Sequence, residues 1–176
     1  ACVERLAQMA EALGCGLVRV FTAYEREDMP IAEAWRRTVT GLQECCDRAA
    51  EFGVTIGLQN HHDIAVHSKA LLELLDDVDR DKCALMFDPW SVCLRGEDPA
   101  MAAREMAPHA VYTTLADYVR LPRYRYQSEL INYRAMPEDF ARAVPIGEGD
   151  MANAEFVRAL LDGGFDGPIA YEMCSP

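Results

Sequence analysis

Hydrophobic positions along the chain follow two alternating spacings. Stretches with apolar residues three or four positions apart, as on one face of a helix, alternate with short stretches rich in Val, Ile, Leu and Phe, as in buried strands. Gly14 and Gly53 follow the first two helical stretches, where glycine commonly ends a helix. The pattern predicts helices at residues 3–13, 31–52, 68–78, 98–106 and 153–162, strands at 17–21, 54–59, 84–87, 110–115, 144–146 and 168–172, and an irregular segment from 116 to 143.

This alternation of helices and strands predicts an α/β fold with a parallel sheet. The strand VTIGLQ favours a barrel over an open sheet, because bulky and smaller side chains alternate along it. Its bulky residues, beginning with Val54, would face the helices, and the residues between them, ending with Gln59, would face inward. We therefore expect a partial (β/α)8 TIM barrel. A flavodoxin-like open sheet is the alternative.

Composition narrows the class of protein. The 176 residues, 51% of them hydrophobic, fit a single domain over residues 1–176. The excess of 29 acidic over 17 basic residues gives a net charge of -12, which disfavours nucleic acid and anionic membranes as partners. No apolar run approaches the roughly 20 residues that span a bilayer, and the amphipathic start is unlike a signal peptide. We expect a soluble cytoplasmic protein with no nucleic-acid or membrane partner.

Polar residues stand at the ends of three predicted strands. Gln59 ends the second strand, Asp88 follows the strand that closes with LMF, and Glu172 follows IAY. The alternation along each strand directs all three side chains inward at the same end of the barrel. TIM-barrel enzymes carry their catalytic groups at the carboxyl ends of the strands. The sequence therefore predicts a polar site built from Gln59, Asp88 and Glu172.

The segments around these strand ends resemble the sugar phosphate isomerase/epimerase family, whose members are xylose isomerase-like TIM barrels. The matching segments are VTIGLQNHHD, CALMFDPWS, VYTTLADY, VPIGEGD and FDGPIAYEM, and the resemblance covers nearly all 176 residues. It implies about strands three to eight of the barrel. By this resemblance the chain is a fragment that lacks strands one and two and the last helix. A native, short open form is the alternative.

The resemblance also implies a metal site and catalytic residues. The family's glutamate, aspartate, histidine and glutamate stand at Gln59, Asp88, Thr114 and Glu172, so two carboxylates match and two positions carry neutral residues. The implied cofactor is a divalent metal (Mn, Mg, Co or Zn) with Gln59, Asp88 and Glu172 as its ligands. Glu172 would act as the acid/base, and Asp88 would hold metal or substrate hydroxyls.

Four further residues are candidates for binding the substrate. His61 would point to the barrel mouth, although a solvated loop histidine fits the sequence equally well. Trp90 and Asp117 follow predicted strands and would also lie at the mouth. Arg123 belongs to a segment rich in arginine and tyrosine, which could hold a phosphate or contact another subunit. Arg19 would point into the barrel, where it needs a carboxylate or an anionic substrate as its partner.

The reaction implied by the family is isomerisation or epimerisation of a small sugar, sugar phosphate or sugar acid, by proton transfer next to a carbonyl. Two other functions remain open. One is a metal-dependent lyase or hydrolase on the same barrel, resembling the endonuclease IV branch. The other is a non-catalytic sugar-binding subunit, which the neutral residues Gln59 and Thr114 favour. The expected partners are a small carbohydrate and, in a homo-oligomer, further copies of the chain.

Overall fold

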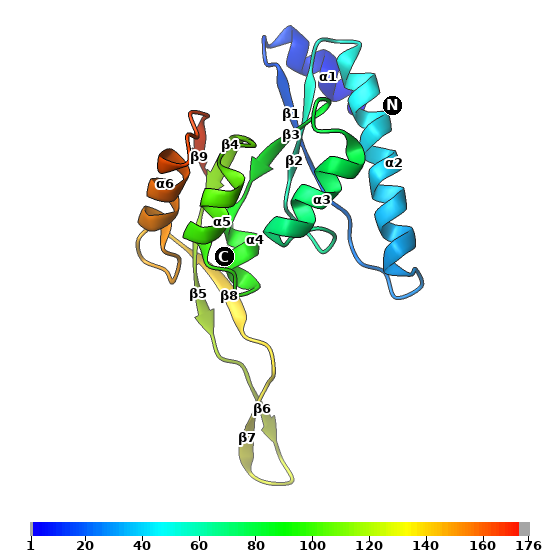
Figure 1. Ribbon diagram of the computed structural model, residues 1–176. Helices are drawn as coiled ribbons and strands as arrows, with labels where there is room; N and C mark the ends of the chain where they lie inside the picture. The colour runs from blue at the N-terminus through cyan, green and yellow to red at the C-terminus, as the bar shows by residue number, and fades with distance from the viewer. Residues whose placement is uncertain (1, 173–176) are drawn as a thin grey trace.

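The computed structural model describes residues 2–172 and is built around a parallel sheet of five strands. The strands lie in the order β1-β2-β3-β4-β9, and each neighbouring pair is parallel. Figure 1 shows this sheet curving through the body with helices beside it. Its members are β1 (Leu17–Phe21), β2 (Thr55–Gln59), β3 (Cys83–Phe87), β4 (Ala110–Leu115) and β9 (Ile169–Tyr171). This half-barrel confirms the expected fold class.

Six helices lie within residues 2–172; the first precedes β1, and the other five lie in the connections between strands. Asp98 begins one of them: its side chain accepts a hydrogen bond from the Met101 backbone N–H at 2.8 Å, and Pro99 occupies the first turn. None of the helices in these residues is long and apolar enough to cross a membrane. The helices are α1 (Cys2–Ala12), α2 (Ile31–Ala50), α3 (Ser68–Val78), α4 (Pro89–Leu94), α5 (Pro99–Met106) and α6 (Asn153–Asp162), of which α4 was not predicted.

The two faces of the sheet differ, as the alternation along the strands predicted. Ile56 and Leu58 of β2 are fully buried in a core that also contains Leu71 of α3 and Phe156 of α6. Gln59 lies outside this apolar cluster and bonds to another polar strand residue. The helix-facing side of the sheet therefore carries the hydrophobic core, and the opposite side carries the polar groups at the strand ends.

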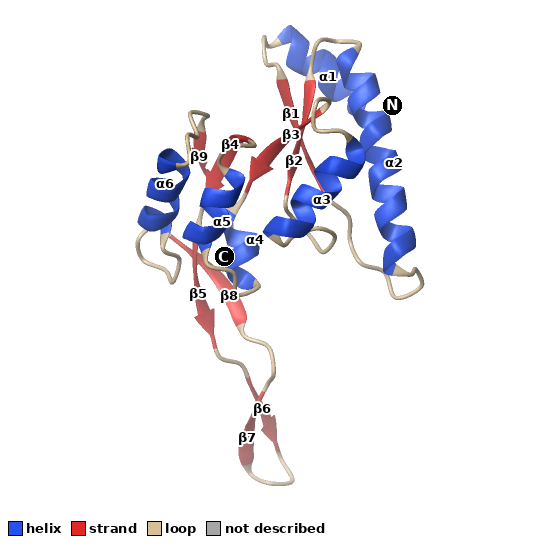
Figure 2. Cartoon of the chain, viewed as in Figure 1, coloured by secondary structure: helices blue, strands red, loops and turns tan. Residues whose placement is uncertain are grey.

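The segment predicted to be irregular, 116–143, is instead mostly strand. Chain segments β5 (Asp117–Leu121) and β8 (Phe140–Val144) pair antiparallel, and beyond them β6 (Tyr124–Gln127) pairs antiparallel with β7 (Asn132–Ala135). Together they form a long hairpin, residues 117–144, which we call the arm. Figure 2 shows the far end of the arm projecting away from the helices and the central sheet.

The strand predicted at 144–146 is wrong as a member of the parallel sheet. Val144 ends β8 and pairs with Asp117 of the arm. No strand separates β4 from β9, because Thr113 and Thr114 of β4 are in direct register with Ile169 and Ala170. The parallel sheet in the described residues therefore has five strands where six were expected.

Candidate active site

The carboxyl ends of the five parallel strands meet at one edge of the sheet, and the predicted polar site lies there. Phe21 pairs in register with Gln59, which in turn pairs with Met86. Asp88 lies just beyond β3, and Glu172 lies just beyond β9, where its backbone N–H donates to the Leu115 carbonyl at 2.8 Å. The strand order thus brings residues more than 100 positions apart to the same edge.

A chain of hydrogen bonds joins three of these strand ends. The Gln59 amide nitrogen donates to the Thr114 hydroxyl at 3.0 Å, and that hydroxyl donates to Asp88 Oδ1 at 3.4 Å. All three side chains are buried. Within the described residues, Gln59 Oε1 is buried and has no hydrogen-bond partner. The two neutral residues at the expected ligand positions are therefore bonded to each other.

Asp88 is a buried carboxylate held by several donors. Besides Thr114, it accepts hydrogen bonds from the Trp90 backbone N–H at 3.0 Å and from the Ser91 hydroxyl at 3.2 Å, and so it caps α4. Burial raises the pKa of Asp88 to about 6; the bonds from Trp90 and Ser91 oppose that rise, and the nearby charge of Glu172 adds to it. Asp88 can therefore accept or release a proton near neutral pH.

Asn60 orients Asp88 and was missed from the sequence. This fully buried side chain donates to the Asp88 carbonyl at 2.9 Å and accepts from the Asp88 backbone N–H at 2.7 Å. The reciprocal pair fixes the backbone on both sides of the carboxylate. A polar residue directly after Gln59 was the only signal in the sequence, and it did not indicate a partner 28 positions away.

Glu172 is paired with Arg19, the inward-facing cation of β1. Arg19 Nη1 donates to Glu172 Oε2 at 3.1 Å, and the side chains are 36% and 40% exposed. The guanidinium carbon also lies 5.0 Å from the centroid of the Phe21 ring. The ion pair joins β1 to β9, the first and last strands of the sheet. The expectation that Arg19 pairs with an inward carboxylate agrees with this contact.

His61 lies next to this ion pair. The His62 backbone N–H donates to His61 Nδ1 at 2.9 Å, so the proton of a neutral ring is on Nε2. Burial lowers the pKa of His61, as do the neighbouring His62 and Arg19, while Glu172 acts in the opposite direction. The ring lies 4.8 Å from that of Phe21. His61 is therefore placed to offer a neutral N–H donor beside Arg19 and Glu172.

The Asp117 carboxylate binds backbone N–H groups of the loop at residues 147–151. This buried carboxylate accepts hydrogen bonds from the backbone N–H groups of Gly147 at 2.9 Å, Gly149 at 3.2 Å and Met151 at 3.1 Å, and from that of Tyr118 at 2.9 Å. A Cβ on Gly149 would lie 2.1 Å from Asp117 Oδ1. These contacts favour a loop-holding role for Asp117 over the predicted contact with substrate.

The other two predicted substrate contacts lie in different places. Trp90 is half-buried at the start of α4, with its ring 4.7 Å from that of Tyr118. Arg123 is exposed on the arm, where its guanidinium lies 4.0 Å from Glu138. The structure thus keeps Trp90 next to Asp88, and it places Arg123 between β5 and β6 on the arm.

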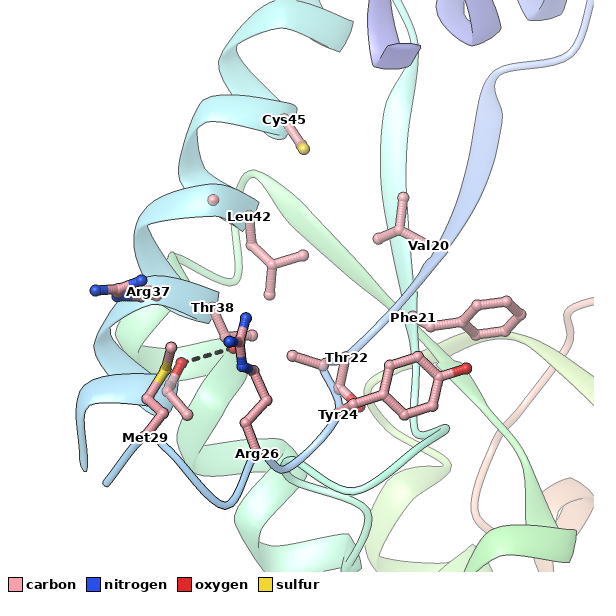
Figure 3. Close-up of a pocket in the computed structure, with 13 residues that line it drawn as sticks. Val20, Phe21, Thr22, Tyr24, Arg26, Met29, Arg37, Thr38, Leu42 and Cys45 are labelled. Atoms are coloured by element: carbon pink, nitrogen blue, oxygen red, sulfur yellow. Dashed lines mark hydrogen bonds between the residues drawn. The ribbon is translucent and has the colours of Figure 1, made fainter. Parts of the chain in front are cut away.

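A mostly apolar pocket lies elsewhere, between the end of β1 and α2 (Figure 3). Leu42 and Cys45 of α2 form one wall, and Val20 of β1 contributes to the other. None of the predicted site residues lines it. The pocket is thus on the helix side of the edge strand, apart from Asp88 and Glu172.

A parallel β/α half-barrel with polar side chains at the carboxyl ends of its strands is the architecture of the TIM-barrel class. The chain belongs to the xylose isomerase-like TIM barrel family, whose model matches residues 1–176. This confirms the resemblance seen in the strand-end segments.

Similar proteins include enzymes that act on sugars. The chain is 27% identical over 141 residues to an inosose dehydratase of Lacticaseibacillus casei, covering 80% of this chain and 47% of that protein. It superimposes on a D-tagatose 3-epimerase-like protein with a TM-score of 0.76 and 22% identity, over 99% of this chain and 62% of the other. It also superimposes on a xylose isomerase-like TIM barrel protein from Mycobacterium smegmatis in complex with magnesium, with a TM-score of 0.70 and 17% identity, over 99% of this chain and 60% of the other. The chain spans about half the length of the curated relatives it matches.

The residues present do not fit a divalent metal site. The Asp88 carboxylate already accepts three hydrogen bonds, Glu172 is paired with Arg19, and the remaining oxygens are the neutral ones of Gln59 and Thr114. Within residues 2–172, no group of three or more His, Cys, Asp or Glu side chains is placed to hold a metal ion. Mg²⁺ and Mn²⁺ require several free oxygen ligands, carboxylates above all. The three predicted ligands share one edge of the sheet without forming a metal-binding cluster.

Proposed function

We propose that the protein is a sugar-modifying enzyme that removes a proton from the carbon next to a carbonyl in a small keto sugar, sugar acid or cyclic keto polyol. The observation that carries the proposal is the pair of carboxylates, Asp88 and Glu172, at the carboxyl ends of β3 and β9, the two strands that flank β4 in the parallel half-barrel sheet. The two side chains lie on either side of Thr114 and differ in burial. Such a pair can divide acid and base roles between its members.

Glu172 is the better placed of the two to act as the base. Its side chain is partly exposed and so can reach a substrate, whereas Asp88 is buried. Glu172 would take the proton as the electron pair of the broken C–H bond moves toward the carbonyl oxygen, giving an enediolate. Asp88, whose pKa is raised to about 6, would hold a substrate hydroxyl and supply a proton to it. His61 and Trp90 would contact the rest of the sugar.

Two outcomes follow from the enediolate, and they define two candidate reactions. Return of the proton to the other face or to the neighbouring carbon gives an epimer or an isomer. Loss of a hydroxyl from the next carbon, protonated by Asp88, gives a dehydrated product. The dehydratase reaction is supported by the 27% identity to inosose dehydratase, and the epimerase reaction by the structural likeness to an epimerase-like protein. Both begin with the same proton abstraction.

Exchange with solvent deuterium tests the proposal and separates the two reactions. The protein is incubated in D2O with a panel of keto sugars, sugar acids and cyclic keto polyols, and each substrate is analysed by mass spectrometry. Deuterium in an epimer or isomer supports the first reaction, and loss of water supports the second. If every member of the panel stays unlabelled and intact while still binding to the protein, the enzyme proposal is wrong and the non-catalytic sugar-binding function takes its place.

A further inference from the structure

Arg19 brings a positive charge to the carboxylates of the strand-end site. Within the described residues, Arg19 is the only Arg or Lys that forms an ion pair with Asp88 or Glu172. This ion pair engages one of the two carboxylates that a metal would need. The positive guanidinium beside that carboxylate also repels a second cation. The charge that a divalent metal would bring is therefore partly present in the protein.

Arg19 also has donors to spare. A guanidinium carries five N–H groups, and the bond to Glu172 is the only hydrogen bond that the Arg19 side chain makes within residues 2–172. Its side chain is 36% exposed, so the remaining N–H groups can reach a ligand. The Phe21 ring on one side and Glu172 on the other limit where the guanidinium can move. A fixed, partly exposed guanidinium with free donors is suited to binding an oxyanion.

Gln59 and Thr114, the other two residues at the expected ligand positions, are uncharged. Gln59 and Thr114 bond to each other and pass their hydrogen bond on to Asp88. The Gln59 amide can offer one neutral oxygen, and the Thr114 hydroxyl is already both acceptor and donor. Neither side chain brings negative charge to the edge of the sheet. These contacts agree with a site that binds polar, uncharged groups.

From these contacts we propose that the site works without a divalent metal, and that the Arg19 guanidinium is the positive group that binds the substrate's carbonyl oxygen. The inference rests on the proposed function and adds to it the group that stabilises the charge. When Glu172 takes the proton, the electron pair of the C–H bond moves onto the carbonyl oxygen. Arg19 donates hydrogen bonds to that oxygen as its negative charge develops. The substrate class is then a carbonyl compound whose oxygen reaches Arg19 while its adjacent C–H faces Glu172.

The first test measures metal binding and needs no substrate. Protein treated with EDTA and desalted is titrated with Mn²⁺, followed by electron paramagnetic resonance and calorimetry. We expect no saturable binding up to about 1 mM, a range in which ordinary protein Mg²⁺ and Mn²⁺ sites bind. The double variant Gln59→Glu/Thr114→His restores a carboxylate and an imidazole, and we expect it to bind Mn²⁺ at least tenfold more tightly. Stoichiometric Mn²⁺ or Zn²⁺ in the unmodified protein would overturn the inference.

The second test addresses Arg19 in the deuterium exchange assay. With EDTA present throughout, the unmodified protein should keep its exchange rate, and Arg19→Met should lose it by about 10²-fold, as removal of a donor to an oxyanion commonly does. Arg19→Lys keeps the charge and should retain more activity than Arg19→Met. Arg104→Met, on the exposed face of α5, is the matched control and should exchange at the unmodified rate. Circular dichroism and thermal unfolding verify that each variant is folded.

The outcomes separate this inference from the proposed function. Exchange that EDTA abolishes and Mn²⁺ restores would support the function and refute the metal-free site. Exchange that survives EDTA but is unchanged in folded Arg19→Met would refute the role of Arg19. If no sugar exchanges, the proposed function fails, and the Mn²⁺ titration alone decides whether the site is metal-free.

Discussion

Replacement of Asp88 by asparagine should stabilise the protein at neutral pH. Burial raises the pKa of this carboxyl from 3.8 to about 6, so its ionisation at pH 7 opposes folding. The shift of about 2 units corresponds to about 3 kcal/mol, at about 1.4 kcal/mol per unit. Asparagine has nearly the same shape and does not ionise. Its side-chain oxygen can still accept the hydrogen bond from the Trp90 backbone N–H.

The sign of the pH dependence follows from the direction of the shift. Well below pH 3.8 the carboxyl is protonated in both the folded and the unfolded chain, so ionisation of Asp88 costs nothing. The cost grows as pH rises from about 4 to about 6 and is constant above that range. The stability advantage of Asp88→Asn should therefore increase by about 2 kcal/mol between pH 4.5 and pH 7.5.

Urea unfolding of the two proteins at several pH values measures this difference. Asp162→Asn, at the exposed end of α6, controls for the general effect of removing a negative charge from an acidic protein. An advantage for Asp88→Asn that is the same at pH 4.5 and pH 7.5, or that matches the control, would refute the argument that burial opposes the charge of Asp88.

Two predictions concern the loop that Asp117 holds. Asp117→Ala leaves four backbone N–H groups without their acceptor. It should lower the free energy of unfolding, measured with urea, by at least about 3 kcal/mol. A loss below about 1 kcal/mol would contradict the loop-holding role. Gly149→Ala places a Cβ 2.1 Å from Asp117 Oδ1 and should cost about 1–3 kcal/mol, whereas Gly16→Ala meets nothing within 4 Å and should change the melting temperature little. Equal melting temperatures for these two glycine variants would show that the close approach at Gly149 is not needed.

The hydrophobic pattern predicted the five parallel strands well, because each is a short apolar run between amphipathic helices. It did not predict the strands of the arm. β6 and β7 are largely exposed, so their tyrosines and arginines do not form the alternating apolar and polar pattern of a half-buried strand. The hydrophobic pattern also failed at residues 144–146, where an apolar run suggested a buried parallel strand. That run follows directly from β8, whose partner is β5, a pairing set by the arm and not by local sequence.

The candidate site was predictable in position but not in its contacts. The strand-end positions of Gln59, Asp88 and Glu172 followed from the alternation along the strands and from the family resemblance. Their partners come from other strands: Thr114 lies 55 positions from Gln59, and Arg19 lies 153 positions from Glu172. The periodicity of one strand cannot predict such contacts, because they depend on the order of the strands in the sheet.

In the proposed reaction, Glu172 removes a proton from a sugar carbon next to a carbonyl. The most direct measurement is the rate of deuterium exchange into the best substrate of the panel, compared between the unmodified protein and Glu172→Gln. Glutamine keeps the shape and can still bond Arg19, but it cannot accept the proton. We predict a loss of at least about 10²-fold for Glu172→Gln and an unchanged rate for Glu105→Gln on the exposed face of α5. An unchanged exchange rate in folded Glu172→Gln would show that Glu172 is not the base.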